Sequence, residues 1–320
     1  MKSPGRISPA FLDEVRGIVG FSDDDTRIVP SYWYHRPDQD FPPKAIARPE
    51  DHSGGPTLNI SCTQSDMPAS AQKKLVRLWC ETLPTLKSVR TLWFSCRVSQ
   101  ELFDAACTMP GLEGLYLKWN VVESLQSLRL APQLRYLYLG ASSRVESLEH
   151  VASLKELEWF QVESPSKAFE IEALGKMARL VGLGLTGSES KKLELQSFAP
   201  LSELRGLKWL HLGAVHVRDA SLVPLAQLTS LEWLGVGNYF SVEEFARLSA
   251  HLPGVICDWL SPYVRYHRSM FPCRTCGVNW RVGTPGKGSK LLCPTCDTQK
   301  LAESIVRFNE AKSAAIRGAI

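Results

Sequence analysis

The chain has 320 residues, a formal net charge of +4, 44% hydrophobic residues and 22% charged residues. This length exceeds one compact domain of about 100–150 residues, so it allows a repeat array, a large single domain or two units. The composition is that of a globular protein and argues against long-range disorder. Charged side chains interrupt the first thirty residues, and no apolar run reaches the roughly 18 residues of a membrane span, so we expect a cytoplasmic protein with no membrane association.

Residues 1–56 precede the first regular pattern and are taken as an N-terminal extension. Ser8 stands before a proline, and apolar residues follow at helical spacing to position 18, which predicts a short helix. Residues 30–56 are rich in proline, aspartate and aromatic residues, including the Tyr-Trp-Tyr run at 32–34. This segment is either an ordered strap or a mobile arm, and its aromatic residues favour packing because disordered segments contain few of them.

Leu58, Ile60 and Cys62 alternate with polar residues, as in a strand with one buried face. Residues 71–83 have the pattern of a helix that ends before Pro84. A stack of repeats exposes an apolar edge at each end and needs an atypical unit to cover it. This strand and helix therefore predict an N-terminal cap.

From residue 86 onward one apolar pattern recurs, with the spacing apolar-x-x-apolar-x-x-apolar-x-apolar. The third position of its seven copies falls at Leu92, Leu115, Leu137, Phe160, Leu183, Leu210 and Leu234, at intervals of 22 to 27 residues. The last two apolar residues of each copy alternate at period two, so both point inward from one strand. Between the strands, apolar residues recur at helical offsets in residues 100–107, 148–154, 220–228 and 242–252. The near-constant interval argues against an unordered set of amphipathic helices.

With this spacing the sequence resembles the leucine-rich repeat family over residues 57–260. The resemblance implies an α/β fold, a solenoid with a curved parallel sheet on its concave side and helical segments on its convex side. The asparagine expected three positions after the last strand residue occurs only at Asn120, so we expect less regular turns after the strands than in the family. An eighth copy begins at Leu252 but loses the pattern at Cys257, where the solenoid should end.

The nine cysteines divide into two groups. Five lie scattered in apolar runs, where a free cysteine behaves as a small hydrophobic residue. The other four form two Cys-x-x-Cys pairs with sixteen residues between them, Cys273 with Cys276 and Cys293 with Cys296. Two such turns can aim four sulfurs at one point and complete the tetrahedral shell that Zn²⁺ prefers. An odd total with one tight cluster favours metal binding in a reducing compartment over disulfide bonds.

Residues 261–300, around these pairs, resemble the zinc ribbon family, in which two knuckles sit on facing hairpins. Four cysteine ligands leave no open coordination position, so we expect one structural Zn²⁺ that replaces a hydrophobic core. Iron in a four-cysteine site and His267 as another ligand are the chemical alternatives.

Residues 301–320 are predicted to belong to a helix that begins near Thr298, because Leu301, Ile305, Phe308 and Ala311 recur on one face. This face either covers the zinc module or the end of the solenoid, or it binds a partner. A surface helix normally turns such a face toward its own domain, which favours the first interpretation.

The outward positions of the predicted strands carry ring side chains, namely Trp93, Tyr116, Tyr136, Tyr138, Trp159, Trp209, His211 and Trp233. Aromatic side chains supply large contact areas at low entropy cost, so we expect a partner protein on this concave face. The alternative is that neighbouring rings only stack along the strands. Gly184 and Gly235 are expected to leave room for the partner to approach.

These features predict a non-enzymatic protein–protein interaction scaffold, and the repeat resemblance suggests a bacterial immunity or effector-like role. The alternative is nucleic-acid binding through the zinc module, which contains seven basic residues and only one acidic residue. The basic residues are Arg265, Arg268, Arg274, Arg281, Lys287, Lys290 and Lys300. The sequence contains no Gly-rich phosphate loop, Gly-x-Ser-x-Gly or His-Glu-x-x-His motif, so no enzyme activity is expected.

Overall fold

The computed structural model describes residues 33, 42–165, 170–188, 190–266 and 272–318. The helix expected after Ser8 lies outside these residues. Two compact units make up the chain, and each is treated by itself below. The described residues up to 219, together with 227–231, form the repeat unit, and 220–226 with the residues from 232 onward form the C-terminal unit. Over the described ranges, no helix is long and apolar enough to cross a membrane.

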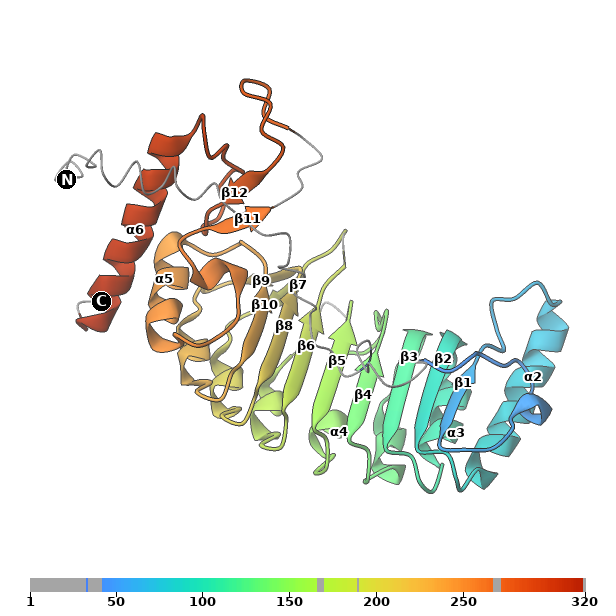
Figure 1. Cartoon of the computed structure of the whole chain (residues 1–320). Coiled ribbons are helices and arrows are strands. Elements are labelled where there is room, and N and C mark those ends of the chain that lie inside the picture. The colour runs from blue at the N-terminus through green and yellow to red at the C-terminus, as the bar shows by residue number, and fades with distance from the viewer. Residues whose placement is uncertain (1–32, 34–41, 166–169, 189, 267–271, 319–320) are drawn as a thin grey trace. The chain divides into compact units, whose positions relative to one another are not determined.

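A parallel sheet of eight strands has the order β1-β2-β3-β4-β5-β6-β8-β10 (Figure 1). The strands are β1 (Thr57–Ile60), β2 (Thr91–Val98), β3 (Gly114–Asn120), β4 (Tyr136–Leu139), β5 (Trp159–Glu163), β6 (Gly182–Thr186), β8 (Trp209–Gly213) and β10 (Trp233–Val236). In the repeat unit one inward position of each strand forms a continuous cross-strand row, made of Leu58, Leu92, Leu115, Leu137, Phe160, Leu183 and Leu210. All seven are buried. The predicted α/β fold with a repeated strand is therefore confirmed.

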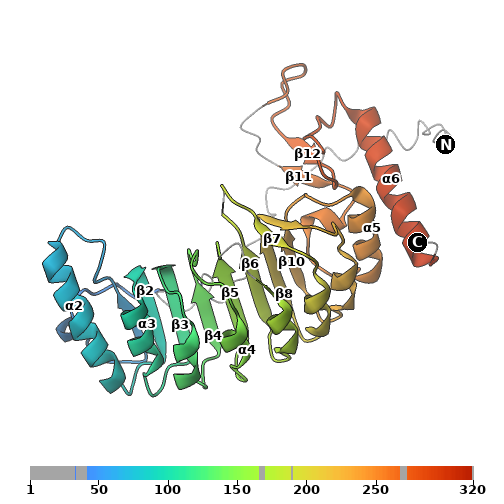
Figure 2. The same cartoon turned by 180° about the vertical axis from the view of Figure 1, so that it is seen from behind.

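Short helical segments return the chain from each strand to the next, on the other side of the stack from the outward face of the sheet (Figures 1 and 2). They are α3 (Gln100–Cys107), η4 (Gln126–Leu130), α4 (Glu149–Ala152), η5 (Glu172–Lys176) and η6 (Ala199–Glu203). The expected helices at 100–107 and 148–154 are present, the second over four residues only. The segments labelled η are 3₁₀ turns, a tighter helix that suits such short connections. Each segment turns at least one buried side chain toward the sheet, which closes the core.

The N-terminal end of the sheet is covered on its open edge. The backbone of Ile46 pairs in parallel with β1, donating to the carbonyl of Asn59 (2.9 Å) and accepting from the amide of Ser61 (2.8 Å). Trp79, which is fully buried on α2 (Ala69–Thr82), donates from Nε1 to the carbonyl of Ala47 at 2.9 Å. An unpaired strand edge invites association with other chains, and this strand-and-helix cap removes it.

Three of the turns after the strands share one backbone conformation. Ala141, Ser164 and Ala214 all adopt left-handed backbone conformations, with φ of 48°, 50° and 47°, two residues after the last inward residue of their strands. Asn120 is buried and donates from Nδ2 to the carbonyl of Gly140 (2.7 Å). Among the described turns, three thus have a left-handed residue and one has a buried asparagine that bonds to the next repeat.

Replacing Ala141 with glycine is expected to raise the free energy of unfolding by about 0.5 kcal/mol. A left-handed conformation costs a non-glycine residue about 1–2 kcal/mol, and glycine removes this strain from the folded state. The greater chain entropy of glycine in the unfolded state offsets roughly half of that gain. Urea unfolding measures the difference. The matched control is Ala105→Gly inside α3, which should lower stability by about 1 kcal/mol. Equal losses for both variants would contradict the expectation.

The described part of the C-terminal unit combines β10 with two α-helices, two 3₁₀ turns and a small antiparallel sheet. Its elements are η7 (Val223–Gln227), α5 (Val242–His251), η8 (Asp258–Leu260), β11 (Val264–Tyr266), β12 (Arg281–Gly283) and α6 (Thr298–Ile316). Asn238 ties β10 to the later part of the unit, since its Nδ2 donates to the carbonyl of Thr284 (3.0 Å) and its Oδ1 accepts from the amide of Gly286 (2.7 Å). Ile256 makes an isolated parallel bridge to Trp233 of β10.

Helix α6 begins at Thr298, as predicted, and buries Leu301, Ile305 and Phe308. Leu301 and Ile305 form one cluster with Val282 of β12. Arg307 on the same helix donates to the carboxylate of Glu243 on α5 (2.7 Å). The apolar face of α6 therefore packs within its own unit, and the alternative that this face binds a partner is wrong.

Candidate functional site

Two rows of outward side chains cross the sheet of the repeat unit, because equivalent positions of parallel strands stand next to one another. The first row in register is Asn59, Trp93, Tyr116, Tyr138, Gln161, Gly184 and His211, and the second is Thr91, Gly114, Tyr136, Trp159, Gly182 and Trp209. We call the seven ring side chains of these rows the aromatic face. The eighth ring residue of the prediction, Trp233, is half-buried on β10 in the C-terminal unit.

Rings of the aromatic face contact one another as well as solvent. Tyr116 and Tyr138 stack with their centroids 4.3 Å apart and their planes 20° apart. The Trp159 and Trp209 rings approach to 4.8 Å although the strand β6 lies between their own strands. Gly182 on β6 makes this contact possible, because a Cβ atom at that position would collide with the Trp159 indole. The stacking expected as an alternative to partner binding is therefore part of the structure.

The space above Gly184 is filled by the protein itself. A Cβ atom built on this glycine would lie 2.9 Å from Cγ of Gln161, a residue of the neighbouring strand. The expectation that Gly184 leaves room for a partner is wrong, because the side chain next to it leans over the glycine.

Trp33 of the N-terminal extension also lies on the aromatic face. Its ring centroid is 5.8 Å from that of Trp93, edge to face at 88°, and 5.4 Å from that of Tyr116. Trp33 and Trp93 are each only 1% exposed, and Tyr138 belongs to the same buried cluster. Tyr136 and Trp159 pack against this cluster but remain partly exposed.

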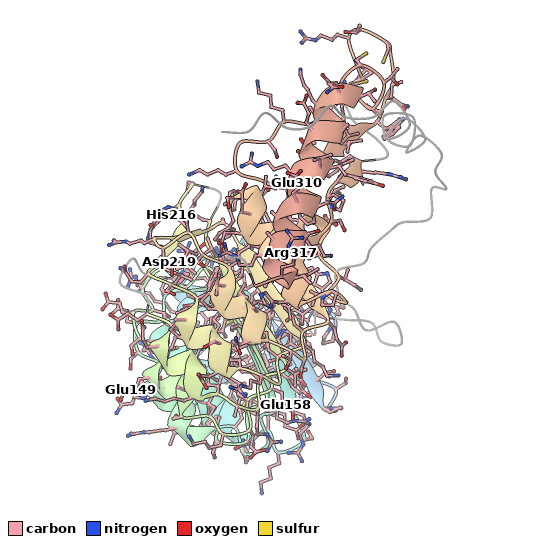
Figure 3. All side chains as sticks on the ribbon, turned by 90° about the vertical axis from the view of Figure 1, so that its left-hand side faces the viewer. Glu149, Glu158, His216, Asp219, Glu310 and Arg317 are labelled. Atoms are coloured by element: carbon pink, nitrogen blue, oxygen red, sulfur yellow. The ribbon has the colours of Figure 1, made fainter. Side chains whose placement is uncertain are left out.

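The ring positions of this face are uncharged at neutral pH. Burial lowers the pKa of His211 below its ordinary value, so its imidazole is neutral at pH 7. Charges gather instead at the edge where the strands begin, where Arg135 donates to both carboxylate oxygens of Glu158 at 2.9 Å. Glu158 and His216 lie at different edges of the repeat unit (Figure 3). Uncharged ring side chains with charged residues at the border match the usual anatomy of a protein interface, whose centre is depleted in charged residues.

The second candidate site is the cysteine cluster of the C-terminal unit. The first pair lies between β11 and β12, which are antiparallel, and the second follows Leu292, whose backbone bridges to Val282 of β12. Turns shape both pairs, since the amide of Gly277 donates to the carbonyl of Cys273 and the amide of Asp297 to that of Cys293, each at 2.9 Å. Asp297 stands where the first turn has glycine, and its carboxylate accepts from the Cys293 amide at 2.9 Å.

The four sulfurs, those of Cys273, Cys276, Cys293 and Cys296, lie within 4.8 Å of one another. The Cys273–Cys296 and Cys276–Cys293 sulfur pairs are 3.8 and 3.5 Å apart. A tetrahedral ion with metal–sulfur bonds of about 2.3 Å would hold its sulfurs roughly 3.8 Å apart, whereas a disulfide would bring them to about 2 Å. The spacing thus fits a metal ion better than a disulfide. His267, the alternative ligand, lies outside the described residues.

Several basic residues of this region have contacts within the protein. Arg281 donates to the carbonyls of Val278 and Trp280 (3.3 Å each), and Lys300 pairs with Asp297 at 3.3 Å. Arg274, Lys287 and Lys290 are exposed, Arg265 lies over the ring of Tyr263, and Arg268 lies outside the described residues. Internal contacts thus occupy part of the charge that suggested nucleic-acid binding.

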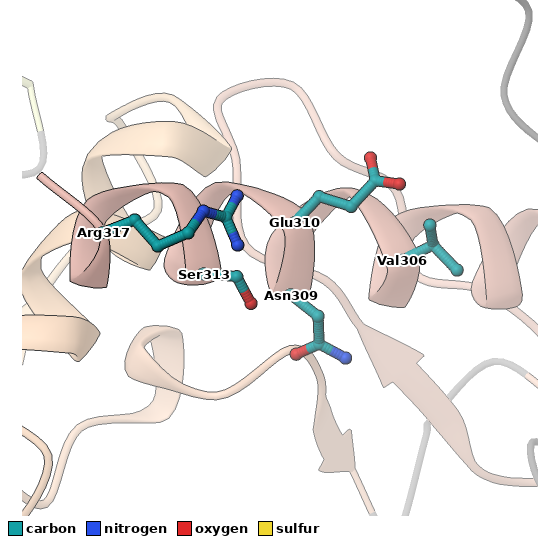
Figure 4. Close-up of a pocket in the computed structure, with 5 residues that line it drawn as sticks. All are labelled: Val306, Asn309, Glu310, Ser313 and Arg317. Atoms are coloured by element: carbon teal, nitrogen blue, oxygen red, sulfur yellow. The ribbon is translucent and has the colours of Figure 1, made fainter. Parts of the chain in front are cut away.

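A shallow hollow on the outside of α6 is lined by Val306, Asn309, Glu310, Ser313 and Arg317 (Figure 4). All five residues come from one face of a single helix. Among the described residues no second element contributes to this hollow, so it has no converging groups that would orient a ligand.

The repeat register and the parallel sheet define a leucine-rich repeat solenoid. No protein-family model matches the chain, and no curated protein matches its sequence. Among solved structures it is similar to an internalin of Listeria monocytogenes, at 19% identity and a TM-score of 0.45, over 62% of this chain and 64% of that one. It is also similar to a leucine-rich repeat protein of Leptospira interrogans, at 18% identity and a TM-score of 0.43, over 62% and 47%. The chain spans less than two thirds of either structure, and the likeness concerns the fold alone.

Seven of the eight predicted ring residues stand in the two outward rows, whereas the position of Trp33 on that face was not predicted. The repeat period determines outward positions only inside the repeats, and Trp33 lies before the first of them. The density of aromatic residues at 32–34 signalled packing without indicating where the ring would bind.

Proposed function

We propose that the chain is a non-enzymatic scaffold that binds a partner protein on the aromatic face. The observation that supports this best is the set of ring side chains held on the outward side of one sheet, with Tyr136 and Trp159 partly exposed. Rings fixed by a sheet lose little entropy when they bind, and tryptophan and tyrosine are common hot-spot residues. A bacterial immunity or effector-like role is the narrower form of this proposal and rests on the repeat resemblance alone.

The double variant Tyr136→Ala/Trp159→Ala is expected to bind the principal partner at least tenfold more weakly. A hot-spot residue contributes about 2 kcal/mol or more when truncated, and these two keep solvent-accessible surface. Pull-down with the intact protein identifies the partner, and titration of that purified partner against both proteins measures the change in affinity.

The matched control is Leu130→Ala, which truncates an apolar side chain that is 50% exposed on η4, on the helical side of the repeat unit. It should bind the partner as the unaltered chain does. Undiminished affinity of the double variant would remove the aromatic face from the proposal. Copurified nucleic acid with steeply salt-dependent affinity, lost in Lys287→Ala/Lys290→Ala, would favour the alternative function instead.

We further propose that the four cysteines bind one structural Zn²⁺. A full thiolate shell leaves no position for water or substrate, which supports a structural role over a catalytic one. The small cluster of Val282, Leu301, Ala302 and Ile305 is a limited core for this part of the unit, as expected where a metal supplements hydrophobic packing. An odd number of cysteines, four of them in one tight cluster, supports a reducing, cytoplasmic location.

A further inference from the structure

The N-terminal extension places one indole on the aromatic face. Trp33 sits above the outward positions of β2 and β3, edge to face with Trp93 and tilted against Tyr116. Cη2, at the tip of its ring, lies 3.5 Å from the point where a Cβ atom on Gly114 would stand, which is an ordinary van der Waals distance. The ring therefore reaches down to the level of the sheet backbone at β3.

The chain is anchored beside β1, ten positions after Trp33. Asn59 donates from Nδ2 to the carbonyl of Pro43 (2.8 Å) and accepts from Oγ of Ser95 (2.8 Å), so residue 43 is held beside β1. Nine residues lie between Trp33 and Pro43, and ten residue steps of extended chain reach up to about 35 Å. The span from β1 to β3 is only about 10 Å, because neighbouring strands are about 4.8 Å apart. The anchor therefore does not by itself fix the position of Trp33, which lies against Trp93 and Tyr116 and is only 1% exposed.

We propose that the aromatic face contains a docking site for a tryptophan side chain presented by a partner protein, and that Trp33 occupies this site when the partner is absent. The inference rests on the proposed function of the face. The partner would present a peptide segment with one indole, which takes the place of Trp33 between Trp93 and Tyr116. Because Trp33 is tethered, it competes as an intramolecular ligand, and its removal makes the site available.

The test uses the full-length chain and a fluorescein-labelled peptide with the sequence of residues 28–38, Ile-Val-Pro-Ser-Tyr-Trp-Tyr-His-Arg-Pro-Asp. Fluorescence anisotropy measures its binding to the unaltered protein and to Trp33→Ala. The variant is expected to bind the peptide at least tenfold more tightly, since the tethered competitor is gone. A peptide with alanine in place of its tryptophan should bind neither protein, and Trp33→Ala/Tyr138→Ala should bind the original peptide more weakly than Trp33→Ala.

Equal peptide affinities for the unaltered chain and a folded Trp33→Ala variant would overturn the inference, and so would the absence of binding to that variant. Circular dichroism and thermal melting establish that the variant is folded. If it is not, Trp33→Leu keeps an apolar side chain at the site, and it should still gain affinity for the peptide over the unaltered chain. No gain would again overturn the inference. A partner that depends on Tyr136 and Trp159 but is indifferent to Trp33 would leave the proposed function standing and remove the indole site alone.

Discussion

Replacing Cys293 with serine is expected to abolish metal binding and to unfold the segment that carries the two cysteine pairs. The Cys293 sulfur is buried, lies 3.5 Å from that of Cys276 and accepts from the amide of Cys296 at 3.4 Å. Structural zinc sites contribute about 10–16 kcal/mol of apparent binding free energy, which a short segment with a small apolar cluster cannot replace. Elemental analysis should find about one zinc per chain in the unaltered protein and none in the variant.

Limited proteolysis provides the structural readout for the same variant. New cleavage sites should appear within residues 261–300, while the repeat unit stays resistant because its own core is complete. Cys80→Ser is the matched control, since Cys80 is a free cysteine on α2 outside the cluster, and it should retain the metal. A metal-free preparation that is folded, or a Cys293→Ser variant with unaltered melting and cleavage, would show that the cluster needs no ion. Iron in place of zinc would change the identity of the metal but not its role.

Replacing Phe160 with alanine is expected to lower the free energy of unfolding by about 3–5 kcal/mol. Phe160 is fully buried on β5 and stands in register between Leu137 and Leu183. Truncation removes a large ring and leaves a cavity in the middle of the row, where neighbouring repeats depend on each other for burial. Urea unfolding followed by far-ultraviolet circular dichroism measures the loss.

Phe160→Leu is the control for this position, because leucine occupies the same position in the neighbouring repeats on both sides. A change between large apolar side chains usually costs less than about 1.5 kcal/mol. If leucine proved as destabilising as alanine, the local fit of the phenylalanine ring would determine stability, and the interchangeability of repeats would not hold here.

The repeat architecture and the cysteine cluster were predictable from the sequence because both depend on short, regular spacing. An apolar pattern that returns every 22 to 27 residues places each apolar strand residue beside its equivalent in the next strand. This register does not depend on the sequence of the segments between the strands. Two Cys-x-x-Cys turns typically bring their four sulfurs together around one metal ion, so their spacing alone predicts a cluster. The helix that begins at Thr298 was predictable for a similar reason, from Leu301, Ile305 and Phe308 on one face.

Contacts between residues distant in sequence could be read only from the folded chain. The indole of Trp33 lies on Trp93 and Tyr116, sixty or more positions further along, and no periodicity relates them. The stacking of Trp159 on Trp209 depends on a glycine in the strand between them, so it requires the order of strands as well as their register. Local patterns select which face a side chain occupies, whereas the free energy of packing selects which distant partner covers it.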